Sequence, residues 1–154
     1  MKTRTVILTL VMCLVGLTLC FAENPMIGTW KLNEAKSQLS PGSEKNSTVV
    51  YEVAGERIKC AIDGVDGQGN PLHIEWTGKF DGKDYPLTGD PSGDTRAYKK
   101  ISQRTMEGTT KKDGTVTGSS RIVIAADGKS RTVTTNLTDP AGKKMQNVAF
   151  YDKQ

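Results

Sequence analysis

Few side chains in this sequence have the types and spacing that catalysis needs. His73 is the one histidine, and no Gly-x-Ser-x-Gly turn is present to direct a serine toward it. Segment 63–70 is rich in Asp, Gly and Asn, but it lacks the ligand spacing and the closing Glu of an EF-hand loop. We therefore expect no catalytic residue, no metal site and no cofactor. Segment 63–70 is expected to form a turn.

The cysteines offer little more chemistry. Cys13 and Cys20 fall in the N-terminal apolar segment, so Cys60 remains alone and no intramolecular disulfide is expected. Cys60 lies two residues from both Ile58 and Ile62, on the same face of a predicted strand. We interpret it as a small buried apolar side chain. A thiol that reacts or touches a ligand is the alternative.

Residues 1–22 have the three parts of a secretory signal: a basic start, an apolar run and a small-x-small exit that ends at Ala22. Cleavage there would leave residues 23–154 as one domain, secreted or periplasmic. The alternative is a lipid anchor at Cys20, because the residues before it partly resemble a bacterial lipobox.

The charge balance excludes a nucleic-acid partner. Removal of Lys2 and Arg4 would lower the formal net charge from +4 to +2. The lysine doublets fall at predicted strand ends or turns, where charge solvates the edges. No aromatic side chains alternate with a basic stripe, which nucleic-acid binding would require.

Short runs rich in Thr, Val, Ile and Tyr, separated by Asp-Gly pairs, dominate the rest of the chain. Asp-Gly supplies the positive φ angles of tight hairpins. The predicted strands cover 27–33, 48–53, 57–62, 72–80, 83–87, 95–101, 104–111, 115–125, 130–137 and 144–152. Segment 34–46 is expected to be a polar loop with room for one helical turn. The pattern predicts an all-β, antiparallel, up-and-down meander that closes into a barrel of about 8–10 strands.

Strand 72–80 has the clearest alternation. Leu72, Ile74, Trp76 and Phe80 share one face, and the other face carries polar side chains that include His73. Period-two alternation of this kind is typical of a sheet with one dry and one wet face. His73 is therefore expected at the surface.

Few large apolar side chains occur between positions 102 and 135, whereas Thr is frequent there. Thr favours strands but fills an interior poorly. This favours a barrel that encloses a partly polar cavity, since eight or more strands leave room for one small ligand.

Three segments carry a family resemblance: Gly-Thr-Trp-Lys-Leu-Asn at 28–33, the segment 76–89 and the ending Phe-Tyr-Asp-Lys-Gln at 150–154. The chain resembles the calycin superfamily of lipocalins and fatty-acid-binding proteins, most of all the bacterial lipocalin-like exported proteins. The resemblance implies structural roles for Gly28 and Trp30. The tryptophan would pack across the closed base of the barrel, beside an arginine from a late strand, either Arg121 or Arg131.

The resemblance fails at the fatty-acid anchor. Fatty-acid-binding proteins hold the ligand carboxylate with an Arg-x-Tyr near the C-terminus. Here Tyr151 is present, but Ala149 occupies the position of the arginine. Loop 34–46 also replaces the helical lid of those proteins. We therefore do not expect fatty-acid binding in the usual geometry.

The sequence supports two hypotheses of function, and neither is enzymatic. In the first, the barrel binds a small hydrophobic ligand through inward side chains: Tyr51, Ile58, Cys60, Leu72, Ile74, Trp76 and Phe80. In the second, the barrel is a filled scaffold, and loops 34–46 and 81–94 bind a protein or the cell envelope. An internal cavity of roughly 300 Å³ or more would favour the first. No transmembrane span is expected in the mature chain, because outward positions such as Lys59 and Glu75 would face lipid.

Overall fold

The computed structural model describes residues 24–138 and 141–154. The described residues form ten strands and one short 3-10 helix, η1 (Glu34–Lys36). The predicted signal segment, with Cys13 and Cys20, lies outside the described residues. The strands are β1 (Gly28–Leu32), β2 (Lys45–Ala54), β3 (Arg57–Val65), β4 (Pro71–Gly78), β5 (Tyr85–Thr88), β6 (Thr95–Lys100), β7 (Thr105–Lys112), β8 (Thr115–Ile124), β9 (Ser130–Thr138) and β10 (Lys144–Lys153).

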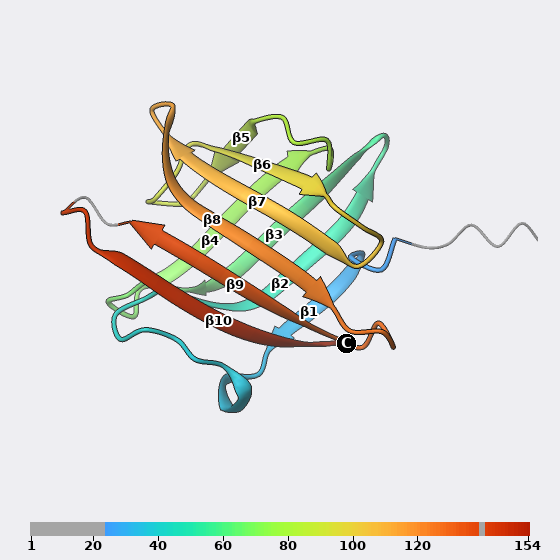
Figure 1. Ribbon diagram of the computed structural model, residues 1–154, viewed down its shortest axis with the longest axis horizontal. Helices are drawn as coiled ribbons and strands as arrows, with labels where there is room; N and C mark the ends of the chain where they lie inside the picture. Colours follow the sequence, from blue (N-terminus) through green and yellow to red (C-terminus); the bar gives the residue numbers. More distant parts are fainter. Residues whose placement is uncertain (1–23, 139–140) are drawn as a thin grey trace, which may run out of the picture.

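The ten strands form a closed antiparallel barrel in which each strand pairs with its neighbours in sequence (Figure 1). The last strand, β10, pairs with the first, β1. In this pairing Trp30 lies opposite Lys153, and Leu32 lies opposite Tyr151. β1 also pairs with β2, with Trp30 opposite Val49. The predicted all-β up-and-down barrel is confirmed.

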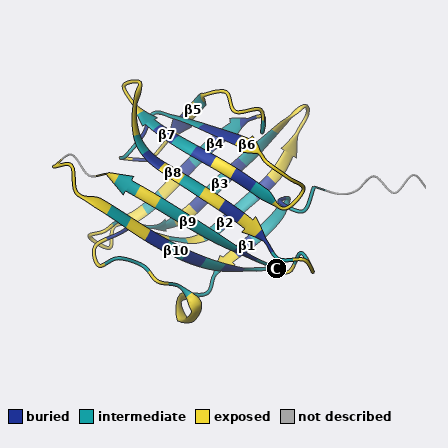
Figure 2. Ribbon diagram, viewed as in Figure 1, coloured by how far each residue is buried: buried dark blue, intermediate teal, exposed yellow. Residues whose placement is uncertain are grey.

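Buried and more exposed side chains alternate along most strands, and Figure 2 shows the alternation along β7 and β8. In β4, Ile74 and Trp76 are buried, while His73 is exposed as predicted. At the β7–β8 corner, Asp113 and Gly114 both have positive φ angles, 50° and 76°. Two such residues in succession are what a type I′ hairpin turn requires.

One predicted corner is wrong. The Asp63-Gly64 pair lies inside β3, which continues to Val65 and pairs there with β4. A Cβ on Gly64 would overlap the backbone carbonyl of Lys45. The missing side chain therefore lets β2 and β3 approach closely. The chain reverses at Asp66 instead, whose backbone N–H donates to the carbonyl of Asn70 (2.9 Å).

One end of the barrel, which we call the base, is closed by the segment before β1. Trp30 is fully buried, and its indole N–H donates to the carbonyl of Met26 (2.9 Å). The Arg131 guanidinium lies over the Trp30 ring at 4.7 Å from its centroid. Arg131 is therefore the late-strand partner of Trp30. Arg121 is exposed and pairs with Glu107 instead (2.6 Å).

Segment 34–46 packs along β10 and reaches the opposite end, which we call the mouth. Gln38 forms an isolated bridge with Val148. The backbone N–H of Ser40 donates to Asn147 Oδ1 (2.8 Å). Within the described ranges, no helix is long and apolar enough to cross a membrane.

Candidate functional site

The barrel encloses a cavity of about 110 Å³ between the base and the mouth. Every strand except β4 and β5 contributes at least one side chain to its wall. Its apolar walls include Leu32, Val49, Ile62, Ile122, Val133 and Leu137, and its charged groups are Glu44, Asp90, Arg96 and Arg131. The small and hydroxyl-bearing residues of β7, β8 and β9 form another part of the wall: Thr110, Gly118, Ser119, Ser120 and Thr135. The bulk-poor second half of the chain therefore leaves space inside, as the sequence predicted.

Only one of the seven predicted ligand-binding residues, Tyr51, lines this cavity. Cys60, Ile74 and Trp76 are buried in the core. The remaining three are half-buried and pack against that core: Ile58, Leu72 and Phe80. These six side chains point inward or pack on the core, but they occupy another part of the interior from the cavity.

Stacked aromatic rings explain why that part is filled. Trp76 and Phe80 are parallel, with centroids 6.1 Å apart, although Phe80 lies beyond the end of β4. Tyr98 meets the Trp76 ring edge to face at 4.9 Å, and Tyr85 meets it from another side at 5.9 Å. Aromatic pairs prefer these offsets, and together the rings leave no room for a ligand beside Trp76.

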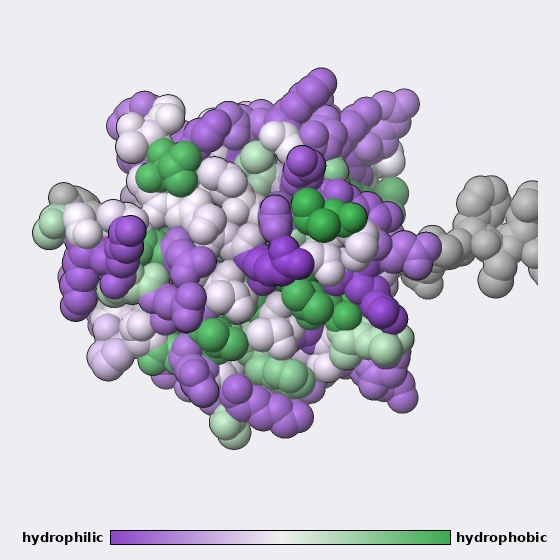
Figure 3. Space-filling view, in the orientation of Figure 1, coloured by the Kyte–Doolittle hydropathy of each residue, from purple (hydrophilic) through white to green (hydrophobic). Residues whose placement is uncertain are grey.

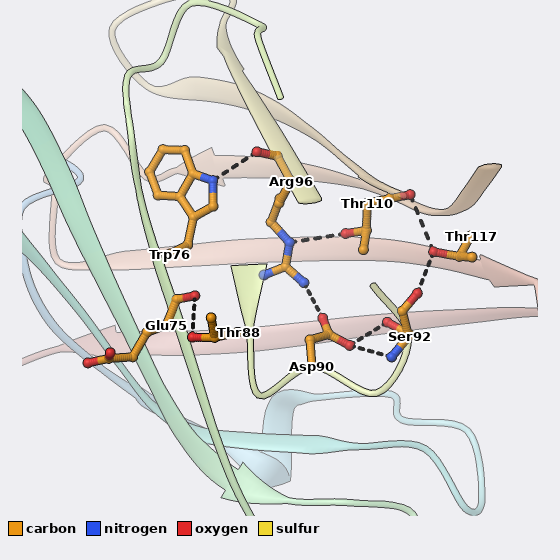
Figure 4. A network of polar contacts seen from close by, with 8 residues as sticks. All are labelled: Glu75, Trp76, Thr88, Asp90, Ser92, Arg96, Thr110 and Thr117. Carbon is orange, nitrogen blue, oxygen red and sulfur yellow. Dashed lines mark hydrogen bonds and ion pairs between the residues drawn. The ribbon is translucent and has the colours of Figure 1, made fainter. Parts of the chain in front are cut away.

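A buried ion pair forms the wall of the cavity near the mouth (Figure 4). Arg96 Nη2 lies 2.6 Å from Asp90 Oδ2, and the two side chains are only 14% and 2% exposed. Arg96 Nε donates to the hydroxyl of Thr110 (3.0 Å). Although burial alone would lower it, the pKa of Arg96 is raised overall by Tyr98 and Asp90. Arg96 therefore stays charged.

The same network fixes the loop between β5 and β6. Asp90 Oδ1 accepts from both the backbone N–H and the hydroxyl of Ser92, at 2.7 and 2.6 Å. The Thr117 hydroxyl donates to the Ser92 carbonyl (2.7 Å). At the end of the network away from the loop, the indole N–H of Trp76 donates to the carbonyl of Arg96 (2.8 Å). Figure 4 shows how these contacts join the aromatic rings to the loop.

Glu44 and Asn46 contribute polar groups at the mouth. Burial, together with the nearby Asp90 and Asp66 carboxylates, raises the pKa of Glu44 to about 6, although Arg96 opposes the shift. Asn46 Oδ1 is buried and has no hydrogen-bond partner among the described residues. The mouth therefore carries an acid that titrates near neutral pH and an unsatisfied acceptor.

At the base end of the cavity lies Arg131, which is 2% exposed. Besides Trp30, its guanidinium lies over the rings of Tyr151 and Tyr51, at 4.9 and 5.3 Å. One N–H contacts Met26 Sδ (3.2 Å), and Nε has no partner in the described part of the chain.

The buried thiol and phenols nearby are held in their neutral forms. Burial raises the pKa of the Cys60 thiol, although Tyr51 and two arginines oppose the shift. Burial also raises the pKa of Tyr151 to about 12 and that of Tyr51 well above its ordinary value. A protonated, inaccessible thiol is a poor nucleophile, so the geometry gives no support to a reactive Cys60.

The surface holds one further group of titratable residues, around His73. Its Nδ1 lies 2.6 Å from Asp63 Oδ1, and this hydrogen bond raises the pKa of the imidazole. Its Nε2 lies 3.7 Å from Glu75, which also pairs with Lys59 at 2.7 Å. Among the described residues, no Ser, Thr or Cys side chain is hydrogen-bonded to this imidazole. Across residues 24–138 and 141–154, no three His, Cys, Asp or Glu side chains are arranged to hold a metal ion.

Loop 81–94 is tied to the barrel at both of its ends. Near its start Asp81 forms an isolated bridge with Lys99, its middle part forms strand β5, and near its end Asp90 pairs with Arg96. The exposed large apolar side chains are scattered: Val53, Ile101, Val116 and Val123. On the face shown in Figure 3, green apolar patches are separated by hydrophilic residues.

Sequence reasoning missed Glu44, Asn46, Asp90 and Arg96. One signal was present for Arg96, because alternation along 95–101 places it on the same face as Tyr98. A charge on the face of a buried aromatic indicates a polar interior. No comparable signal exists for Asp90, since Asp, Pro, Ser and Gly in succession indicate only a turn.

The comparisons with known proteins identify no family. The sequence matches neither the known protein-family models nor any curated protein sequence. The fold and the geometry of the cavity are therefore the basis for a functional proposal.

Proposed function

We propose that this chain is a non-catalytic binding protein that holds one small molecule inside its barrel. The observation that carries the proposal is the cavity inside the barrel, whose walls combine apolar side chains with buried polar groups. Two of these polar atoms, Arg131 Nε and Asn46 Oδ1, have no protein partner among the described residues. Both residues line the cavity, and buried polar atoms are normally hydrogen-bonded, so these unsatisfied atoms favour a ligand or water in the cavity.

The cavity limits the size of the ligand. An engineered apolar cavity of about 150 Å³ binds benzene, whereas drug-sized ligands occupy roughly 300 Å³ or more. The cavity here is about 110 Å³. A ligand no larger than benzene, with about six non-hydrogen atoms or fewer, therefore suits this barrel, and a fatty acid does not.

The cavity also narrows the expected chemistry of the ligand. The sequence suggested a hydrophobic ligand, but four charged residues and several hydroxyl groups line the space. A purely apolar molecule would leave Arg131 Nε and Asn46 Oδ1 without a hydrogen-bond partner, which costs free energy. We therefore propose an amphipathic ligand, with both apolar surface and at least one polar group.

A filled scaffold that binds a protein through loops 34–46 and 81–94 is the second candidate. The observation that favours it is the volume of the cavity: about 110 Å³ is below the roughly 300 Å³ that we expected of a ligand-binding barrel. Against it, both loops are held to the barrel by hydrogen bonds, so much of their polar surface is already used.

We further propose that the protein is exported, either secreted or periplasmic, with cleavage after Ala22. This proposal rests on the signal pattern of residues 1–22 alone. Retention of a lipid anchor at Cys20 is the alternative.

Native mass spectrometry of the protein purified from its own source, compared with a denatured sample, tests both proposals. The binding proposal predicts a non-covalent adduct that is lost on denaturation. The denatured mass reports the N-terminus, which export with cleavage places at Glu23. A single unliganded mass under native conditions, reproduced when the extract itself is added back, would favour the filled scaffold.

A further inference from the structure

Arg131 is a buried cation that no carboxylate neutralises. Its side chain is 2% exposed, yet none of the ion pairs among the described residues includes it. The other buried arginine, Arg96, has Asp90 at 2.6 Å. Burying a charge without a partner is costly, so the environment of Arg131 requires an explanation.

Three aromatic rings account for part of its stabilisation. The guanidinium carbon lies 4.7 to 5.3 Å from the centroids of Trp30, Tyr151 and Tyr51. Cation–π contacts favour charge at the faces of the rings. They do not satisfy the N–H donors of the guanidinium, which point outward in its own plane.

Those donors are under-used. Among the described residues, one N–H contacts a thioether sulfur, Met26 Sδ, and Nε has no partner. A thioether is a weak acceptor. A guanidinium with free in-plane donors is suited to a carboxylate, which accepts two parallel hydrogen bonds from it.

Arg131 also lines the cavity, so a ligand there would reach it. The other charged groups of the cavity wall are Glu44, Asp90 and Arg96. Asp90 neutralises Arg96, and Glu44 adds negative charge at the mouth. Arg131 lies at the base, away from Glu44, and is the one cation of the wall without a carboxylate partner among the described residues. A single negative charge placed at the base therefore complements Arg131, whereas a dianion would place more negative charge there than Arg131 can neutralise.

We infer that the cavity binds a small monocarboxylate whose carboxylate group accepts hydrogen bonds from Arg131. This inference rests on the proposed binding function and adds the chemical class and the orientation of the ligand. The apolar part of the acid would extend toward the mouth, between Val49, Ile62 and Val133. Arg131 would then both pack on Trp30 and recognise the ligand.

The test compares acids with amides of the same shape. Isobutyrate and isobutyramide form one pair, and acetate and acetamide form a smaller one. Each is titrated into the ¹⁵N-labelled mature protein at constant chloride, with backbone amide and arginine Nε–H signals recorded. We expect each acid to bind about tenfold more tightly than its amide, because a charge-assisted hydrogen bond is about twice as strong as a neutral one. The Arg131 Nε–H signal should shift with the acid and not with the amide.

Variants assign the effect to Arg131. Arg131→Lys keeps the charge but loses the fork of donors, and should abolish the preference for acids. Arg121→Gln is the matched control, because the Arg121 side chain is exposed on the outer face of the barrel and is not part of the cavity wall; it should leave the preference intact. The comparison of acid and amide in the unmodified protein remains decisive even if Arg131→Lys does not fold.

The outcomes separate the inference from the proposed function. If acids and amides bind the cavity equally well, the binding function stands and the inference is overturned. If the acids bind but shift surface lysine neighbours instead of Arg131, the inference is also overturned. If no compound of either pair perturbs any residue of the cavity, and native mass spectrometry finds no adduct, the proposed function falls with it.

Discussion

Glu44 places a titratable acid beside a buried ion pair. The groups that face it are Asp90, Arg96 and Asp66, and burial is the largest cause of its raised pKa of about 6. The folded protein therefore keeps the Glu44 proton at pH values where the unfolded chain has lost it. By linkage, this contribution to stability is present below the ordinary pKa and is lost as the pH rises through about 6.

Glu44→Gln should remove this pH dependence. The free energy of unfolding of the unmodified protein should fall by about 1 kcal/mol between pH 4 and pH 7 because of this residue, after allowing for its partial exposure to solvent. Urea unfolding of both proteins across this range measures the difference. Parallel curves for the two proteins would contradict the assigned environment of Glu44.

Trp76 is the largest side chain in the aromatic group, and its role is structural in this account. Trp76→Ala should lower the free energy of unfolding by about 3–5 kcal/mol, because it removes a fully buried ring and leaves a cavity. Urea unfolding checks the value, with the outward-facing Thr77→Ala as the control. A stable Trp76→Ala protein that has lost ligand binding would instead place the ligand beside Trp76.

The role of a residue could be predicted from the sequence where the residues next to it along the chain determine that role. The resemblance at Gly28 and Trp30 implied an arginine from a late strand, and Arg131 occupies that position. The predicted ligand residues came from alternation, which reports that a side chain points inward. Alternation does not report whether the interior is filled at that level, so Trp76 and Phe80 were assigned to the ligand although they stack on each other.

At the scale of elements, the loop between β5 and β6 depends on Asp90. Asp90→Asn would leave Arg96 buried without its counter-charge, and should cost about 3–5 kcal/mol. Glu107→Gln breaks the exposed pair with Arg121 and should cost less than about 1 kcal/mol. Thermal unfolding of the two variants side by side compares them. Equal, small losses would mean that water solvates Arg96 in solution.

β5 is the weakest strand of the barrel wall. It pairs with β4 through two residue pairs and with β6 through two, whereas β9 and β10 share nine. Fewer cross-strand hydrogen bonds permit local opening at lower free energy. In hydrogen exchange, the amides of β5 should therefore exchange before those of β9 and β10. Uniform protection around the barrel would contradict this order.

Strand positions were mostly predictable, and the differences have local causes. Alternation and Asp-Gly corners located each strand within a few residues of its observed limits. Gly64 misled the prediction, because a glycine that permits close backbone approach has the same signature as a turn glycine. The start of β2 at Lys45 was also missed, since this polar residue pairs with Val65 of β3 ahead of an irregularity in the register before Thr48.

At the scale of the whole molecule, closure of the barrel determines which side chains line its interior. Pairing of β1 with β10 turns inward side chains from distant segments toward one space. Glu44, Asp90 and Arg131 all line this space, although they are far apart in sequence. No pattern within one segment shows which residues of distant segments come together. The barrel was therefore predictable, and the charged residues that line its cavity were not.

A crystal structure of the protein purified from its own source tests the central claim most directly, because it shows what occupies the cavity. We expect electron density for a small bound molecule, with an acceptor atom within hydrogen-bonding distance of Arg131 Nε. Density for water alone, or side chains that close the space between Arg131 and Glu44, would contradict it.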